Sequence, residues 1–200
     1  MILKITEDDF EDAVGIAHEM MRTGKVIVYP TDTVYGLGGD ATSPEVVKKI
    51  LGMKGIAERK PLSVMMSADL IEYYCETGIW EDIILKKYLP GPYTFILKLR
   101  HPLAATPTKK LGVRIPDSAF CQSLCERFGR PIITTSANIT TKKPPARFDE
   151  IDKKILDAVD IAIDGGPTKY GAASVVIDLV TRKLIREGGE TIDLIELPQP

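Results

Sequence analysis

Residues 26–40, VIVYPTDTVYGLGGD, are the stretch that decides the fold class of this chain. Val26–Tyr29 is a short run of β-branched and aromatic residues, which predicts a buried strand. Pro30 ends this strand, because proline has no N–H to donate to a sheet ladder. The segment 31–40 then predicts a loop rich in glycine and hydroxyl groups, and such loops often carry binding sites on a rigid base. A tight turn without a ligand is an equally open interpretation, since the loop matches neither the P-loop nor the dinucleotide-binding pattern.

The rest of the chain alternates predicted helices with predicted strands. Helical spacing of apolar residues, with caps or a proline at several starts, predicts helices between Thr6 and Gly24, from Pro44 into the Gly52–Gly55 segment, and over 68–76, 81–89, 118–128 and 149–159. Apolar runs bounded by turn residues predict strands over 62–66, 93–99, 111–115, 131–135, 160–163, 174–179 and 183–187. Because some strands are joined by short turns and others by helices, the pattern predicts a mixed sheet covered by helices on both sides.

Length and composition favour one soluble domain. The chain has 200 residues, of which 44% are hydrophobic and 27% charged, and we expect one domain over 1–200, with its core at about 8–188 and a partly disordered tail at 191–200. The N-terminus turns acidic at once and no apolar run is long enough for a bilayer, so we expect neither a secretory signal nor membrane attachment. Three cysteines, an odd number, favour a reducing cytoplasm. A net charge of −2 disfavours a surface that binds nucleic acid throughout, although a local basic cleft stays open.

Metal and nucleophile chemistry finds little support in the sequence. His18 and His101 are far apart, and Cys121 and Cys125 lie four residues apart on a predicted helix without a second pair of ligands. Packing in the core is the favoured interpretation of these cysteines, and a zinc site the disfavoured one. The sequence has no G-x-S-x-G elbow. We therefore expect chemistry that relies on positioning and electrostatics, without a catalytic residue that reacts covalently.

Hydroxyls and cations gather instead at predicted strand ends. Arg114 lies inside a strand between apolar neighbours, so it is either paired in the core or faces a cleft, and the sequence leaves both open. A basic segment follows the second helix, for which a solvated loop is the simpler interpretation. Together the hydroxyls and cations suit an anionic ligand such as a nucleotide triphosphate, because arginine and lysine bind phosphate oxygens strongly. The group comprises Thr31, Thr33, Lys54, Arg59, Lys60, Arg114, Thr134, Thr135, Ser136, Asn138, Ser174 and Arg186.

Six segments carry a resemblance to a known family. They are YPTDTVYGLGGDA at 29–41, the lysine segment at 54–62, LPGPYTFILK at 89–98, LGVRIPD at 111–117, TTSAN at 134–138, and SVVIDL at 174–179 with LIREG at 184–188. With these segments, the chain resembles the YrdC-like threonylcarbamoyl-AMP synthase family over about 24–188. The first segment and TTSAN together are specific to that family.

The resemblance implies a fold, a reaction and a set of binding residues. The fold is α+β: a single three-layer α/β/α domain, YrdC/RibB-like, whose central, strongly twisted mixed sheet has about seven strands. Members condense L-threonine, bicarbonate and ATP, with Mg²⁺, into threonylcarbamoyl-AMP and pyrophosphate for the t6A modification of tRNA, and they work with the machinery that transfers the group. No protein side chain is expected to bind the metal. The resemblance implies L-threonine binding by Thr33, Arg114, Thr134 and Ser174, and ATP binding by Lys54, Lys60, Lys110, Ser136, Asn138, Pro144 and Arg186.

Two departures from the family pattern leave alternatives open. The family usually has K-x-R after the second helix, and here Ile56 replaces the arginine; further along, Lys60 and Met65 replace an asparagine and a histidine. The loss of one charged hydrogen bond to phosphate costs about 1.5–3 kcal/mol, unless Arg59 substitutes for the missing group. The chain is therefore a synthase, a paralogue of the YciO branch with another nucleotide-related role, or a protein that binds tRNA or double-stranded RNA. The lysine pairs at 109–110, 142–143 and 153–154 motivate the last alternative.

Overall fold

The computed structural model describes residues 1–6, 9–56 and 60–192, and its elements follow much of the predicted pattern. The helices are α1 (Phe10–Arg22), α2 (Pro44–Lys54), α3 (Ala68–Tyr74), α4 (Ile79–Tyr88), α5 (Ala119–Phe128), α6 (Lys153–Ala158) and the 3₁₀ turn η1 (Phe148–Glu150). The strands are β1 (Ile2–Lys4), β2 (Ile27–Tyr29), β3 (Gly36–Gly38), β4 (Val64–Met65), β5 (Cys75–Glu76), β6 (Tyr93–Leu99), β7 (Lys110–Arg114), β8 (Ile132–Ile133), β9 (Thr135–Ser136), β10 (Ile161–Asp164), β11 (Val175–Asp178) and β12 (Lys183–Arg186). Within the described residues, every helix is too short or too polar to cross a bilayer.

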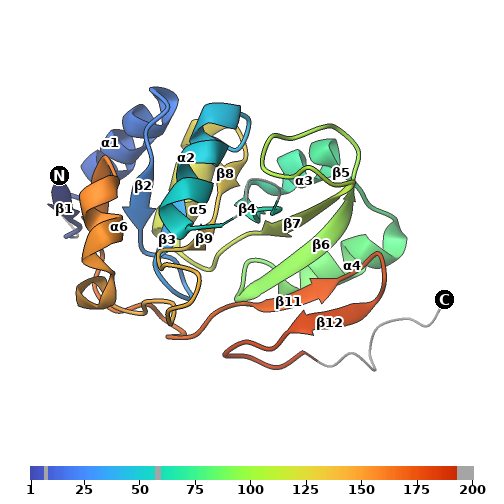
Figure 1. Cartoon of the computed structure of the whole chain (residues 1–200). Coiled ribbons are helices and arrows are strands. Elements are labelled where there is room, and N and C mark those ends of the chain that lie inside the picture. Colours follow the sequence, from blue (N-terminus) through green and yellow to red (C-terminus); the bar gives the residue numbers. More distant parts are fainter. Residues whose placement is uncertain (7–8, 57–59, 193–200) are drawn as a thin grey trace.

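The strands form two mixed sheets, so the prediction of a single sheet is wrong (Figure 1). The five-stranded sheet has the order β1-β10-β2-β3-β9, and the seven-stranded sheet has the order β12-β11-β6-β7-β4-β8, with β5 paired to β6. The two sheets meet where Asp40 forms an isolated bridge with Ile132, and where the amide of Ile133 donates to the carbonyl of Gly39 over 2.9 Å. The segment that follows β3 thus joins β8 of the other sheet through a few backbone hydrogen bonds, which sequence patterns do not reveal.

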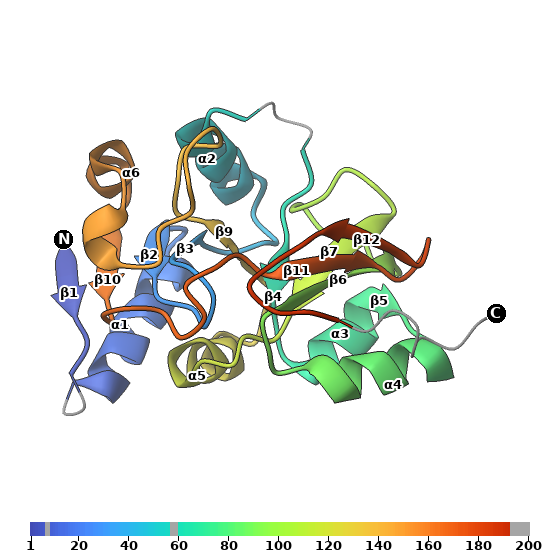
Figure 2. The same cartoon turned by 90° about the horizontal axis from the view of Figure 1, so that it is seen from below.

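The helical layers differ between the two sheets (Figure 2). Around the five-stranded sheet the predicted three layers are present: Ile27 and Tyr29 of β2 pack with α1 and α5, while Val26 and Val28 pack with α2 on the other face. In Figure 2, α3 and α4 lie on one side of the seven-stranded sheet, and the described part of the chain places no helix on its other side. The described elements thus leave that second face of the seven-stranded sheet without a helical layer.

Alternation along β6 explains the uncovered face of the seven-stranded sheet. Phe95 and Leu97 are buried in the core cluster that includes α3 and α4 residues. Thr94 lies between such neighbours, and successive side chains of a strand point to opposite faces. Arg114 of β7 alternates in the same way with the buried Val113. A face that carries a threonine and an arginine cannot bury itself against an apolar helix, so it is free to form a polar site.

Residues 36–38 form a strand, where the sequence predicted part of a glycine-rich loop. β3 pairs antiparallel with β2 and with β9. A Cβ atom on Gly36 would lie 2.9 Å from the ring of Tyr29, and one on Gly38 would lie 2.1 Å from the carbonyl oxygen of Ile133. These two glycines are therefore required by packing inside the sheet, and the close approach of a ligand is not needed to explain them.

Several predicted boundaries also shift. The helix predicted at 149–159 divides into η1 and α6, the strand predicted at 131–135 divides into β8 and the start of β9, and the end of the helix predicted at 68–76 is β5. β1 was not predicted. Each of these pieces is two to six residues long, and elements this short are fixed by tertiary pairing more than by local propensity.

Candidate functional site

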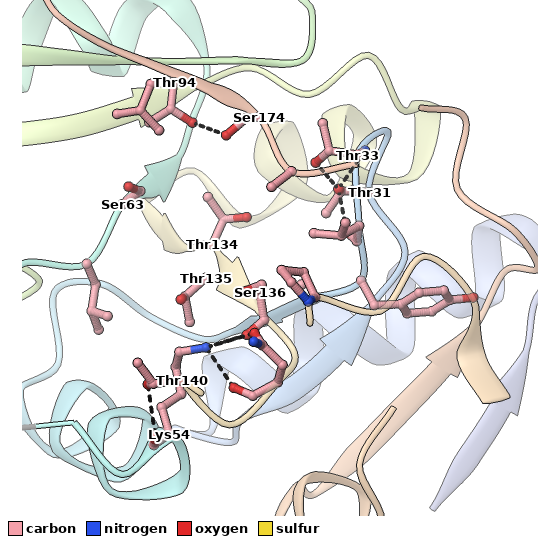
Figure 3. A pocket seen from close by; sticks show the side chains of 18 of the residues that line it. Thr31, Thr33, Lys54, Ser63, Thr94, Thr134, Thr135, Ser136, Thr140 and Ser174 are labelled. Carbon is pink, nitrogen blue, oxygen red and sulfur yellow. Dashed lines mark hydrogen bonds between the residues drawn. The ribbon is translucent and has the colours of Figure 1, made fainter. Parts of the chain in front are cut away.

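A cavity of about 370 Å³ lies between the two sheets, and both contribute to its wall (Figure 3). The loop after β2, the end of α2, the segment before β4, the strands β6, β7, β9 and β12, and the segments before and within β11 all line it. All of the predicted site residues except Lys110 lie in this wall: Thr33, Lys54, Lys60, Arg114, Thr134, Ser136, Asn138, Pro144, Ser174 and Arg186. Segments up to about 150 residues apart in the sequence thus meet at one place.

Lys110 lies elsewhere, and Arg59 falls outside the described residues. Lys110 begins β7, at the opposite end of that strand from Arg114, and its ammonium group forms an ion pair of 2.7 Å with Asp178. The structure therefore does not bring Lys110 to the cavity. The prediction that Arg59 reaches back to replace a missing family arginine concerns a residue whose position is not described.

Arg114 is held by a buried ion pair and one hydroxyl group. Its guanidinium group donates to the carboxylate of Asp32 and, over 3.0 Å, to Oγ1 of Thr33. The second carboxylate oxygen of Asp32 accepts from the backbone amide of Asp117 at 3.0 Å. The Arg114 and Asp32 side chains are 6% and 0% exposed, and among the described residues the buried Nε of Arg114 has no hydrogen-bond partner. Both interpretations left open for Arg114 therefore hold: it is paired, and it faces a cavity.

The hydroxyl of Thr33 is fixed by its neighbours. Thr31 donates its hydroxyl hydrogen to the carbonyl of Val34 at 2.7 Å, and its Oγ1 lies 3.0 Å from Oγ1 of Thr33. Because Thr31 has only one hydroxyl hydrogen, Thr33 is the donor between the two. Arg114 donates to Thr33 as well. The remaining capacity of Thr33 Oγ1 is therefore one lone pair, which is left for a further hydrogen-bond donor.

Lys54 is turned toward the segment that follows β8. It is the last residue of α2, which starts at the Ser43 cap and ends at Gly55 in the left-handed conformation with φ 63°. The Lys54 ammonium donates to the carbonyl oxygens of Ser136 and Asn138 at 2.6 and 2.9 Å and lies 3.4 Å from Oδ1 of Asn138. Burial, with a further contribution from the nearby charge of Lys60, lowers the pKa of Lys54 to about 8. Lys54 therefore holds the backbone of the TTSAN segment in place through these two carbonyl groups.

Ser174 stands at the centre of a second polar cluster. The guanidinium of Arg186 donates to the Ser174 carbonyl at 2.8 Å and to its Oγ at 3.1 Å. Oγ1 of Thr94 lies 2.8 Å from Ser174 Oγ. Burial, and secondarily the charge of Arg114, lowers the pKa of Arg186. The two arginines thus lie close enough to repel each other, and an anion between them would relieve this repulsion.

The wall of the cavity is cationic. The described residues that line it include no aspartate or glutamate, and they include Lys54, Lys60, Arg114, Lys142 and Arg186. Hydroxyls supply most of the other polar groups. Within the described residues no cluster of three histidine, cysteine or carboxylate side chains could hold a metal ion. The site therefore suits an anionic ligand and has no built metal centre of its own.

Several members of the site were missed from the sequence, among them Ser63, Thr94 and Thr140 in the wall and Asp32 behind it. Asp32 supplies the negative charge that offsets the cost of burying the Arg114 guanidinium group, and Thr94 contacts Ser174. Thr94 alternates with the buried Phe95 and Leu97, so the sequence places it on the strand face opposite the core, but it does not indicate Ser174 as its partner. Nothing local indicates Asp32 as the partner of Arg114, since 82 residues separate the two in the sequence.

Comparisons with known proteins agree with this fold. The family model Sua5_yciO_yrdC, described as telomere recombination, matches residues 19–188. A Methanocaldococcus jannaschii protein that carries the provisional name threonylcarbamoyl-AMP synthase is 35% identical over 191 residues, which are 94% of this chain and 91% of that protein. The crystal structure of Pyrococcus abyssi Sua5 complexed with L-threonine is 32% identical with a TM-score of 0.88, over 94% of this chain and 57% of that one. Escherichia coli YciO is 27% identical with a TM-score of 0.82, over 94% of this chain and 95% of its own.

The chain thus spans nearly the whole length of two of these relatives and little more than half of the third. The family model covers most of the chain, from the end of α1 to the residues after β12. On these grounds the chain belongs to the Sua5/YciO/YrdC family.

Proposed function

We propose that the chain is a threonylcarbamoyl-AMP synthase, which condenses L-threonine, bicarbonate and MgATP into threonylcarbamoyl-AMP and pyrophosphate for the t6A modification of tRNA. The observation that carries this proposal is the buried Arg114, which contacts Thr33 in a cationic cavity that also contains Ser174 and Arg186. The relatives named as synthases and the relative crystallised with L-threonine support it. One domain, with its core over about 8–188, would carry the activity. A cytoplasmic location suits its three free cysteines.

L-threonine would bind at the end of the cavity near Arg114. A guanidinium group is the preferred partner of a carboxylate, because its N–H groups match the two carboxylate oxygens. The Nε of Arg114 lacks a partner among the described residues but is enclosed by the protein, so the carboxylate would meet the remaining N–H groups of Nη1 and Nη2. Thr33 offers a lone pair to the amino group or the side-chain hydroxyl of the amino acid, and Thr134 and Ser174 add hydroxyls to the same wall.

ATP would lie along the TTSAN segment. Lys60 and Arg186 supply charge toward the phosphates, while Ser136, Asn138 and Pro144 form the wall beside the nucleotide. Lys54 supports this wall through the carbonyls of Ser136 and Asn138. The described part of the wall contains no carboxylate, and this supports the proposal that Mg²⁺ enters as part of the nucleotide substrate.

The reaction needs no nucleophile from the protein. The uncharged amine of L-threonine attacks carbon dioxide and releases a proton, or attacks bicarbonate and releases water, to give a carbamate. A carbamate oxygen then attacks the α-phosphorus of ATP, and the bond to the bridging oxygen breaks to release pyrophosphate. The protein's contribution is to hold the two substrates in line and to offset the charge that develops on the leaving group. Arg114 orients the amino acid, and Arg186 lies between the two substrates.

Threonine-dependent formation of pyrophosphate tests the proposal. The protein is incubated with ATP, bicarbonate, magnesium and labelled L-threonine, and the adenylate and pyrophosphate are measured together. We expect both products in equal amounts, and neither when threonine or bicarbonate is omitted. The variant Arg114→Lys should lose most of the activity, while Arg127→Lys, at a residue outside the cavity wall, should retain it. A protein that binds ATP and produces no threonine-dependent pyrophosphate would refute the synthase assignment.

A second candidate is a role of the YciO type with a related nucleotide. The observation that favours it is Ile56, an apolar side chain in the cavity wall where synthases usually have an arginine. The match to E. coli YciO over nearly the full length of both chains agrees with it. The RNA-binding alternative stays a prediction: two of the lysines that motivated it, Lys110 and Lys142, form ion pairs with Asp178 and Asp152. Binding to duplex RNA that weakens steeply with salt would support that alternative.

A further inference from the structure

A short turn after the TTSAN segment brings Lys142 to the wall of the cavity. The backbone amide of Lys142 donates to the carbonyl of Ile139 at 2.8 Å. The side-chain amide of Asn138 donates to the carbonyl of Lys142, and its Oδ1 lies 3.4 Å from the ammonium of Lys54. Asn138 thereby links the end of α2 to Lys142, and both lysines line the cavity.

The same turn lies against the carboxyl end of α2. Thr140 donates to the carbonyl of Lys54 through its hydroxyl at 3.0 Å and through its backbone amide at 3.4 Å (Figure 3). Ile56 follows Lys54 by two residues, and it lines the cavity together with Lys60 and Thr140. Lys142 therefore brings a positive charge to the end of the cavity where α2 finishes and where Ile56 brings none.

The partner of Lys142 lies outside the described cavity wall. The Lys142 ammonium forms an ion pair with Asp152, which does not line the cavity. The side chain of Lys142 is 60% exposed, whereas that of Arg114, which also has a carboxylate partner, is 6% exposed. An ion pair of an exposed lysine is weak, because water screens it and the flexible side chain loses entropy. A phosphate group that enters the cavity can therefore take the ammonium from Asp152 at little cost.

Asp152 is fixed by bonds that do not involve Lys142. It is the N-cap of α6, where its Oδ1 accepts from the backbone amide of Lys154 at 2.9 Å, and its other carboxylate oxygen pairs with Lys142. Lysine, in contrast, carries its charge on a flexible four-carbon stem. The ammonium can thus turn from Asp152 toward the cavity while the backbone of Lys142 stays bonded to Asn138.

We propose that Lys142 is a phosphate-binding residue of the cavity, whose ammonium leaves Asp152 when a nucleoside triphosphate binds and donates to a phosphate oxygen. The carboxylate and the phosphate compete for the same ammonium, so Asp152 weakens nucleotide binding. The described wall offers the phosphates no carboxylate to repel them, and a hydrogen bond between an ammonium and a phosphate is charge-assisted. The identification of the nucleotide as ATP rests on the proposed function.

Charge variants at two adjacent lysines test the proposal. Lys142→Gln removes the charge, and we expect ATP to bind about tenfold more weakly by calorimetry, as for the loss of one charged hydrogen bond. Lys142→Arg should restore most of the affinity. Lys143→Gln is the matched control, because it removes the same charge from an exposed residue outside the described wall. Equal effects of Lys142→Gln and Lys143→Gln would overturn the proposal, since only the net charge would then matter.

The competition predicts an effect of opposite sign at Asp152. Asp152→Asn keeps an oxygen that can cap α6 and removes the negative charge, so ATP should bind about threefold more tightly, as for the release of one surface ion pair. Asp149→Asn is the control, because it removes a carboxylate that pairs with Arg147 outside the described wall. In the Lys142→Gln background, Asp152→Asn should have no more effect than Asp149→Asn. The same gain in both backgrounds would overturn the competition.

A crystal structure with a non-hydrolysable ATP analogue shows the exchange directly. We expect Lys142 Nζ at about 2.8 Å from a phosphate oxygen and separated from Asp152. An ammonium that stays on Asp152 beside the bound nucleotide would overturn the proposal.

The outcomes for Lys142 and for the synthase assignment can be told apart. If Lys142→Gln weakens ATP binding and the wild-type protein forms no threonine-dependent pyrophosphate, the proposed function fails and the role of Lys142 stands. If pyrophosphate forms and Lys142→Gln leaves the affinity for ATP unchanged, the role of Lys142 fails and the proposed function stands. A wild-type protein that does not bind ATP would refute both.

Discussion

Asp32 and Arg114 form a buried ion pair at the point where the loop after β2 meets the end of β7. Both charges are removed from water, and a second bond from the Asp117 amide fixes the carboxylate. A buried guanidinium is stable only when its charge is matched. The pair thus sets the orientation of Arg114 before any ligand arrives, and a ligand meets an arginine that is already in place.

Asp32→Asn should strongly destabilise the protein. The change preserves the shape of the side chain and leaves Arg114 buried without its counter-charge, so we expect the free energy of unfolding in urea to fall by about 3–5 kcal/mol. Asp117→Asn is the control, because it removes a carboxylate that pairs with Lys169 at the surface and keeps the backbone amide that Asp32 accepts from. If Asp32→Asn and Asp117→Asn lower the free energy of unfolding by similar, small amounts, the buried ion pair does not have this structural role.

Ile56→Arg should strengthen nucleotide binding if the chain is a synthase. The side chain lines the cavity near Lys54 and Lys60, and a guanidinium there would add a charged hydrogen bond to phosphate. We expect the KM for ATP in the synthase assay to fall about tenfold. Ile56→Met, which adds no charge, should leave the KM unchanged. If the KM for ATP of Ile56→Arg is unchanged or higher than that of the wild-type protein, the result would instead favour the second candidate function.

The pH dependence of stability should reveal the buried ammonium of Lys54. Its pKa in the folded protein is about 8, below the ordinary value of 10.5, so the folded protein releases this proton first as the pH rises. Between these values the unfolded chain binds more protons, and the free energy of unfolding therefore rises with pH. Relative to Lys54→Met, the wild-type protein should gain roughly 2 kcal/mol between pH 7 and pH 10. The measurement is urea unfolding of both proteins across this range, and parallel curves would contradict the assignment.

Two glycine substitutions should have opposite signs. Gly38→Ala places a Cβ atom 2.1 Å from a backbone oxygen inside the sheet, so something must move, and we expect a loss of stability of more than about 2 kcal/mol. Gly52→Ala lies in α2 with open space around the new methyl group, and it should stabilise the protein by about 0.5–1 kcal/mol. Thermal and urea unfolding measure both. If Gly38→Ala were tolerated, the argument that packing requires the glycines of β3 would be wrong.

Elements with strong local signals could be predicted from the sequence. The strand β6 was predicted at its observed bounds, and α2 was predicted from its Ser43 cap, its proline and its glycine stop. β3 could not be predicted, because glycine is a poor strand former and its place in the sheet depends on packing against Tyr29 and the distant Ile133 of β8. Local patterns also say nothing about how one sheet divides into two.

The site residues were predicted mainly through family motifs, since spacing alone gave only polar strand ends. The sequence could not show which residues of a given strand lie at the cavity. Lys110 and Arg114 belong to the same strand, yet only Arg114 of the two reaches the cavity. The partners Asp32 and Thr94 were missed because their roles arise from contacts between segments that are distant in the sequence.

The cavity wall draws on both sheets, whereas their direct backbone connection is slight. A ligand that forms hydrogen bonds with both Thr33 and Ser174 would connect the five-stranded sheet to the seven-stranded sheet, as a crosslink does. The rise in melting temperature with L-threonine and ATP together should then exceed the sum of the rises with each ligand alone. The reason is that each ligand reduces the motion of the two sheets, which lowers the entropy cost of binding the other. Substrate occupancy would in this way become part of what holds the protein in its native shape.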